Sequence, residues 1–225
     1  KLVSISFMLP YSGVDHAGGE YLLRHYRVLA EHCSTLDAFG PDLDRNPLAK
    51  ARNSDVGYDS YRVHIPKFPE WRKSLFGKIL ARLWILLFPV YPDLGAVVSF
   101  RTSAELSECL RSADVVELQW FEYFFFAGLV RRINPTAKII GVAHDIPSQR
   151  IERNLVTAPR FLRSAYIRYV SHLERRMLLR LDWAAAHSEK DAKLLGELSV
   201  SIDVAVLNPP MECLPLESHS LGELH

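Results

Sequence analysis

The stretch LVSISFMLPYSGVDHAGGEYLLRHYRVLAEH, residues Leu2–His32, decides the fold class. It opens with an almost continuous apolar run over Leu2–Leu9, which is typical of a strand buried on both faces of a parallel sheet. A loop with paired glycines follows, and then a helix whose apolar side chains form one broad stripe over Glu20–Glu31. A strand, a glycine loop and a helix start in this order predict a site for an anionic ligand.

The same alternation of strand and helix patterns continues along nearly the whole chain. Repeated alternation of this kind is typical of a parallel sheet wound on both faces. The sequence therefore predicts an α/β fold with a single Rossmann-like, doubly wound domain. Further strands are predicted at Leu36–Phe39, Tyr61–Ile65, Asp114–Leu118, Lys138–Ala143, WAAAHS and VAVLN, and further helices at Ser103–Arg111, Phe121–Ile133, Ala158–Leu181 and Glu189–Leu198.

Composition narrows the class of protein. The 225 residues are 48% hydrophobic and 24% charged, which is ordinary for a globular chain that can bury a full core. A formal net charge of +1 argues against a general nucleic-acid binder. The three cysteines are widely spaced and form no CxxC pair, and the histidines show no metal-binding spacing. We therefore expect no metal site and a reducing, cytoplasmic location.

Gly18 and Gly19 stand directly before the predicted helix. Without Cβ atoms they allow backbone N–H groups to approach a phosphate, and the helix dipole favours negative charge there. The loop reads GVDHAGGE, which is neither the G-x-G-x-x-G dinucleotide pattern nor a Walker loop. The alternative is that the glycines only turn the chain. Asp15 and His16 beside them are a further option, as a general base for an inverting mechanism.

Six segments in order resemble the two-domain GT-B glycosyltransferases, and more narrowly the large retaining family that uses nucleotide-sugar donors. They are the first strand, the GG-E loop, ADVVELQW, GVAHD, AAAHSEKD and VAVLNPP. The resemblance covers residues 1–211 and matches the amino-terminal, acceptor-side half of such an enzyme. The sequence departs from the family pattern at Asn208-Pro209-Pro210, where Asn-Gly is usual.

The resemblance implies transfer of a sugar from a nucleoside-diphosphate sugar to an acceptor hydroxyl, with retention and without a cofactor or an essential metal. It places Gly18 and Gly19 at the donor diphosphate and His144 beside the transferred sugar. At the end of a strand, the His144 imidazole can donate a hydrogen bond to a sugar oxygen. The alternative is a structural histidine that is satisfied by its neighbour Asp145. Ser188 is interpreted first as a helix N-cap and second as a cleft contact, and Asp145 is a further candidate cleft contact.

The resemblance also sets the expected domain organisation. We expect residues 1–211 to form one acceptor-side domain and residues 212–225 to be a linker toward a carboxyl-terminal domain that this chain lacks. Alone, such a half is expected to be inactive, because the second domain holds most of the donor contacts. The rival hypothesis is a non-catalytic Rossmann-like module that binds an anion or nucleotide without chemistry.

Two basic segments bear on the acceptor and on location. The Trp71–Phe88 segment places an apolar stripe that includes Trp84 on one helical face, with Lys78 and Arg82 opposite. This pattern indicates an interfacial helix on an anionic membrane, although a helix packed on the sheet carries the same stripe. The arginine-rich segment Ala158–Arg180 is either a solvated face or a phosphate-binding surface. These segments favour a polysaccharide or lipid-linked glycan acceptor, and peripheral contact with the inner face of a membrane.

Overall fold

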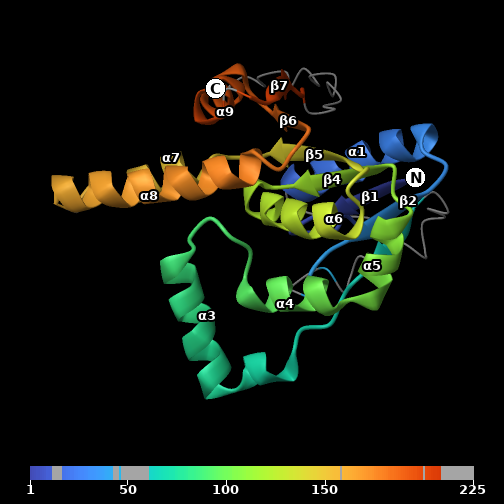
Figure 1. Ribbon diagram of the computed structural model, residues 1–225, viewed down its shortest axis with the longest axis horizontal. Helices are drawn as coiled ribbons and strands as arrows, with labels where there is room; N and C mark the ends of the chain where they lie inside the picture. Colours follow the sequence, from blue (N-terminus) through green and yellow to red (C-terminus); the bar gives the residue numbers. More distant parts are fainter. Residues whose placement is uncertain (12–16, 43–45, 47–60, 158, 200, 209–225) are drawn as a thin grey trace, which may run out of the picture.

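The computed structural model describes residues 1–11, 17–42, 46, 61–157, 159–199 and 201–208 (Figure 1). They form a seven-stranded sheet in which every neighbouring pair is parallel, in the order β3-β2-β1-β4-β5-β6-β7. The predicted Rossmann-like α/β fold is therefore confirmed. The strands are β1 (Leu2–Ile5), β2 (Leu36–Phe39), β3 (Arg62–His64), β4 (Val115–Gln119), β5 (Lys138–Ala143), β6 (Trp183–Ala186) and β7 (Asp203–Val206).

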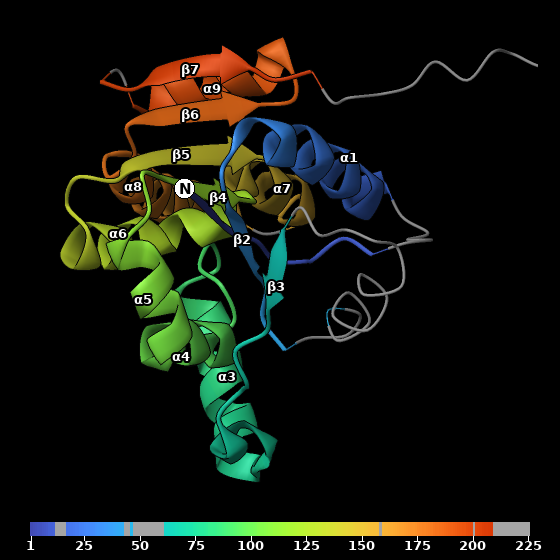
Figure 2. The same cartoon turned by 90° about the vertical axis from the view of Figure 1, so that its right-hand side faces the viewer.

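Helices connect the strands and cover both faces of the sheet (Figures 1 and 2). Most lie where the sequence predicts them, but α4 and α7 are not predicted, and the expected helix Phe121–Ile133 is a 3₁₀ segment followed by a short α-helix. The helical elements are α1 (Ala17–His32), η1 (Glu70–Lys73), α3 (Leu75–Leu87), α4 (Leu94–Thr102), α5 (Ala104–Arg111), η2 (Phe121–Phe126), α6 (Ala127–Ile133), α7 (Pro147–Asn154), α8 (Arg160–Leu178) and α9 (Glu189–Leu198).

Two apolar cores lie on opposite faces of the sheet, because side chains alternate along each strand. Val3 and Ile5 of β1 belong to the larger core, which includes buried residues of α5, η2, α6 and α8. Leu2 faces the smaller core beneath α1. By the same alternation Ser4 lies on the α1 face, where its hydroxyl donates to the Glu117 carboxylate of β4 at 3.0 Å. The α1 face of the central strands is therefore partly polar.

Helix α3 extends away from the sheet in both ribbon views (Figures 1 and 2). Gly77 is its one buried residue, and Leu75 and Phe76 are 76% and 68% exposed. The alternative of a helix whose stripe packs on the sheet is therefore wrong. No helix in the described part of the chain is long and apolar enough to cross a bilayer.

The sequence pattern placed Trp84 in the predicted membrane-facing stripe, and the structure corrects this. Its indole Nε1–H donates to the Pro92 carbonyl at 2.9 Å, and its ring packs against Phe88 at a centroid distance of 4.7 Å. It is only partly exposed and is packed against the larger core. Trp84 therefore anchors α3 to the domain, and the exposed stripe is formed by other residues.

Candidate active site

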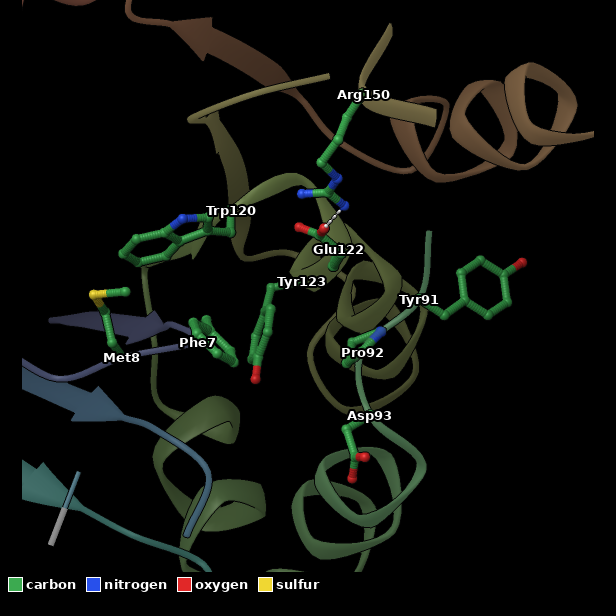
Figure 3. A pocket seen from close by; sticks show the side chains of 9 residues that line it. All are labelled: Phe7, Met8, Tyr91, Pro92, Asp93, Trp120, Glu122, Tyr123 and Arg150. Atoms are coloured by element: carbon green, nitrogen blue, oxygen red, sulfur yellow. Dashed lines mark hydrogen bonds and ion pairs between the residues drawn. The ribbon is translucent and has the colours of Figure 1, made fainter. Parts of the chain in front are cut away.

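The strand order reverses between β1 and β4, and ligands of open parallel sheets bind at the carboxyl end of such a switch point. A cavity of about 350 Å³ lies there (Figure 3). The segment after β1, the segment after β4, helix α7 and the segment before α4 supply its walls. The lining residues are Phe7, Met8, Tyr91, Pro92, Asp93, Trp120, Glu122, Tyr123 and Arg150.

One side of the cavity is aromatic. The Phe7 ring meets the Trp120 and Tyr123 rings edge-on, with centroids 6.3 and 6.4 Å apart (Figure 3). Trp120 has φ of 68°, the only positive φ of a non-glycine residue in the described ranges. Such a left-handed backbone costs about 1–3 kcal/mol and is common at functional sites. Here the strained residue directly follows β4 and presents its indole to the cavity.

Another part of the cavity wall is ionic. Arg150 of α7 donates to Glu122 at 2.6 Å and to Asp145 at 2.8 Å (Figure 3). Although burial opposes its charge, these two carboxylates raise the pKa of Arg150 above its usual value. Asp93 lies at another edge of the cavity and pairs with Arg72 at 3.0 Å. Aromatic faces beside a few charged groups suit a polyhydroxylated ligand, whose ring stacks while its hydroxyls hydrogen-bond.

His144 lies at the carboxyl end of β5, as its position in the sequence predicts. Its ring stacks on Trp120 with centroids 4.0 Å apart and planes 7° apart. Burial first, and then the nearby His187 and His25, lower the pKa of His144 to about 3, so the ring is neutral. Its Nε2–H donates to Gln119 Oε1 at 2.8 Å, which leaves Nδ1 as the acceptor of the neutral ring.

The alternative prediction was that Asp145 satisfies the hydrogen bonding of His144, and the structure gives Asp145 a different role. One carboxylate oxygen accepts from Arg150 at 2.8 Å, while His144 is held by Gln119. The other oxygen, Oδ1, is buried and has no hydrogen-bond partner among the described residues. His144 is thus not satisfied by Asp145. Asp145 instead positions Arg150 at the rim of the cavity.

A buried polar network lies beneath the stacked Trp120–His144 pair. Glu117 is 5% exposed, accepts from Ser4 and pairs with His25 of α1 at 2.7 Å. Burial alone would raise the pKa of Glu117, but His25 and the surrounding hydrogen bonds lower it below its ordinary value. The Tyr21 ring lies edge-on to His144 at 5.1 Å. These contacts fix α1 against the strand ends.

Gly18 and Gly19 lie in the first turn of α1. A Cβ atom at Gly18 would be 3.4 Å from the Trp120 ring and 3.5 Å from the Met8 sulfur. The amino end of α1, where the helix dipole favours negative charge, therefore borders the cavity. The structure thus brings Gly18 close to Trp120, on which the His144 ring stacks. Their diphosphate role stays a prediction, and the proposed base pair Asp15 and His16 lies outside the described residues.

The remaining predicted residues lie elsewhere. The Ser188 hydroxyl accepts from the Asp191 backbone N–H at 3.1 Å, which confirms the N-cap of α9. Lys78 and Arg82 lie on α3, and neither lines the carboxyl-edge cavity. Residues that the sequence did not single out, above all Trp120 and Arg150, form most of this cavity.

One group of potential metal ligands lies in the described part of the chain: Asp37, His64 and Cys109. It is not suited to a cation, because Arg62 already pairs with both Asp37 oxygens, at 2.7 and 2.8 Å. Burial, followed by the Asp37 charge, raises the pKa of the Cys109 thiol and so disfavours the thiolate that a metal would need. We interpret this group as a buried ion-pair network of β2 and β3.

Comparisons with known proteins agree with this architecture. A scan against protein-family models and a search of curated proteins find no match. Among solved structures, the chain is similar to Arabidopsis thaliana UGT89C1 complexed with UDP-L-rhamnose, with 11% identity, a TM-score of 0.51, and coverage of 95% of this chain and 53% of that one. It is similarly close to the trehalose-6-phosphate phosphatase N-terminal domain of Candida albicans, with 11% identity, a TM-score of 0.51, and coverage of 92% and 49%.

The chain thus spans about half the length of these two structures. At this identity the likeness establishes the fold. The chain has the Rossmann-like fold of one half of a GT-B glycosyltransferase, as the order of its sequence segments predicts.

Proposed function

We propose that residues 1–211 are the acceptor-side domain of a glycosyltransferase that moves a sugar from a nucleoside-diphosphate sugar to an acceptor hydroxyl with retention. The cavity at the strand-order switch carries this proposal, because its aromatic wall includes Trp120, and the amino end of α1 and the neutral His144 lie against Trp120. The UDP-L-rhamnose bound by the similar Arabidopsis protein supports a nucleotide-sugar donor. Residues 212–225 would lead toward a second domain that supplies the remaining donor contacts.

Each part of the cavity has a role in this proposal. The first turn of α1, with Gly18 and Gly19, receives the donor diphosphate. Trp120 and Tyr123 stack on the acceptor, and Glu122 accepts hydrogen bonds from its hydroxyls. His144 accepts a hydrogen bond from a hydroxyl of the transferred sugar through Nδ1 and holds that sugar in register. No cofactor beyond the donor and no metal takes part.

The test is acceptor-dependent release of UDP from UDP-sugars by the full-length protein. His144→Ala should lower kcat by roughly 3- to 100-fold with little change in KM for the acceptor, as expected for a hydrogen bond that strengthens in the transition state. Because the pKa of His144 is about 3, the mutation should not change the shape of the pH–rate profile between pH 6 and 9. Ser188→Ala is the matched control, since it removes a helix cap outside the cavity.

Two results would contradict the proposal. If His144→Ala lowers the melting temperature but keeps the turnover of each folded molecule, the histidine is structural. If the full-length protein binds UDP yet releases none from UDP-sugars with any acceptor, the non-catalytic nucleotide-binding module is the better description.

We also propose that α3 holds the protein peripherally at the cytoplasmic face of a membrane, close to a polysaccharide or lipid-linked glycan acceptor. The exposed apolar side chains of α3 are the observation that favours this contact, because exposed apolar patches mark interaction sites.

A further inference from the structure

A second cavity, of about 480 Å³, lies along α3. Four of its lining side chains are cationic and one is acidic. The acidic residue, Asp93, also lines the carboxyl-edge cavity, so the two cavities are neighbours that share a wall. The lining residues of the second cavity, here called the basic cavity, are Arg72, Lys73, Lys78, Ala81, Arg82, Ile85 and Asp93.

The positive charge of the basic cavity is only partly neutralised. Arg72 pairs with Asp93 at 3.0 Å, and Lys73 pairs with the exposed Glu70 at 3.0 Å. Lys78 and Arg82 have no acidic partner among the described residues, and α3 contains no acidic residue at all. Two like charges one helical turn apart repel each other. An anion in the cavity would relieve that repulsion.

The basic cavity adjoins the exposed apolar stripe of α3. At 3.6 residues per turn, Lys78 and Arg82 border this stripe on one side, while Trp84 faces the domain. The sequence pattern predicted Lys78 and Arg82 on the face opposite the stripe. In the structure they instead lie along one edge of the exposed stripe. Seven large apolar residues of α3 are exposed, and one of them, Ile85, lines the basic cavity. The other six, here called the α3 stripe, are Leu75, Phe76, Ile79, Leu83, Leu86 and Leu87.

We propose that the basic cavity binds the phosphate of an anionic lipid headgroup, while the lipid chains lie against the α3 stripe. Cationic side chains beside exposed apolar ones match the chemistry of such a lipid, which joins a phosphate to hydrocarbon. The proposal rests on the proposed function in one respect: because Asp93 lines both cavities, a hydroxyl-bearing group esterified to this phosphate would enter the aromatic cavity. The acceptor is then a lipid-linked polyol or saccharide.

The first experiment is vesicle flotation. The wild-type chain should bind vesicles of phosphatidylcholine with phosphatidylglycerol more tightly than vesicles of phosphatidylcholine alone. It should also bind them more tightly than vesicles given the same surface charge with cholesteryl hemisuccinate, a carboxylate lipid. Lys78→Gln with Arg82→Gln should weaken binding to the phosphatidylglycerol vesicles roughly tenfold to thirtyfold.

A matched control removes two charges elsewhere. Lys190→Gln with Lys193→Gln changes α9, which lies far from α3 in Figure 1, and should leave binding unchanged. Unchanged binding of the Lys78/Arg82 variant would overturn the proposal. Equal binding to phosphatidylglycerol and cholesteryl hemisuccinate vesicles would also overturn it, since any negative surface would then suffice.

The second experiment separates a lipid phosphate from a free one. Inorganic phosphate and glycerol 3-phosphate, added at constant ionic strength, should displace little protein from the vesicles, because they cannot engage the α3 stripe. Full displacement by either would show a site for small phosphates and overturn the lipid assignment. Neither experiment uses a nucleotide sugar. A protein that releases no UDP from UDP-sugars can therefore still bind anionic lipid vesicles as proposed. A protein that releases UDP can equally fail to bind them, so the two proposals are tested separately.

Discussion

At the carboxyl edge of the sheet, Glu117 is 5% exposed and its charge is met by His25 and Ser4, whereas on α3 Leu75 is 76% exposed. A buried charge and an exposed large apolar side chain are both unusual, and both are informative. The first has its partners within the chain, and it fixes the helix that borders the candidate active site. The exposed apolar side chain has no residue in the described part of the chain that covers it. Thus the charge at the carboxyl edge is satisfied within the fold, while α3 keeps an apolar surface that the described residues leave open.

The largest effect should come from breaking the buried network. Glu117→Ala removes the partner of His25 and leaves the Ser4 hydroxyl, which is also hydrogen-bonded to Tyr26 at 2.9 Å, without its carboxylate acceptor. Breaking a buried pair typically costs about 3–5 kcal/mol. We expect that loss in the free energy of unfolding, measured by urea denaturation at neutral pH. A loss below about 1 kcal/mol, the range of an exposed ion pair, would show that the network is not a structural anchor.

Removing the charge of Glu174 should change the free energy of unfolding less than Glu117→Ala does, and should raise it instead of lowering it. It is fully buried on α8, where one oxygen accepts from the Ser148 backbone N–H at 2.7 Å and the other has no partner among the described residues. Burial raises its pKa to about 7, against the ordinary 4.5. Its ionisation therefore destabilises the fold, with no cost below about pH 4.5 and the full cost above about pH 7.

Glu174→Gln keeps the carbonyl acceptor for Ser148 and removes the charge. At pH 8 it should stabilise the protein, by at most about 3 kcal/mol, and at pH 4.5 it should have little effect. Thermal unfolding at the two pH values measures the difference. Glu152→Gln on α7 is the control, because that carboxylate is exposed. Equal stabilisation of Glu174→Gln at both pH values would mean that its ionisation is not the cause.

The local pattern of apolar and polar residues in the sequence was sufficient to predict the strands of the sheet. The strand Lys138–Ala143 and the helix Glu189–Leu198 have the predicted bounds, because each is a strong periodic segment with turn residues at its ends. Helix α4 was missed because Leu94–Thr102 has no apolar stripe on one side, and α7 because Pro147–Asn154 is short and mostly polar. Phe121–Phe126 carries a helical pattern, yet its bulky aromatic residues pack as a 3₁₀ segment against β4.

The candidate site was predictable only where a residue ends a strand or stands at the start of a predicted helix. His144 follows from the first rule and Gly18 from the second. The first rule would also have found Trp120, two residues after the predicted strand Asp114–Leu118. Arg150 could not be found this way, since it depends on an unpredicted helix and on Glu122, 28 residues earlier in the chain. The sequence pattern also could not decide whether the apolar stripe of α3 packs on the sheet or lies exposed. An apolar stripe has the same period whether it meets a sheet or lies exposed.

The smallest effect should come from the α3 stripe. Phe76→Ser with Leu83→Ser replaces two side chains that are 68% and 49% exposed, so the folded chain loses little buried area. We expect the free energy of unfolding to change by less than about 0.5 kcal/mol, as for other surface substitutions. Leu118→Ala in β4 is the matched contrast, because Leu118 is fully buried and its truncation should cost about 2–5 kcal/mol. If the serine variant instead loses more than about 1 kcal/mol, the stripe is packed within the chain itself, and both the membrane contact and the lipid site on α3 lose their basis.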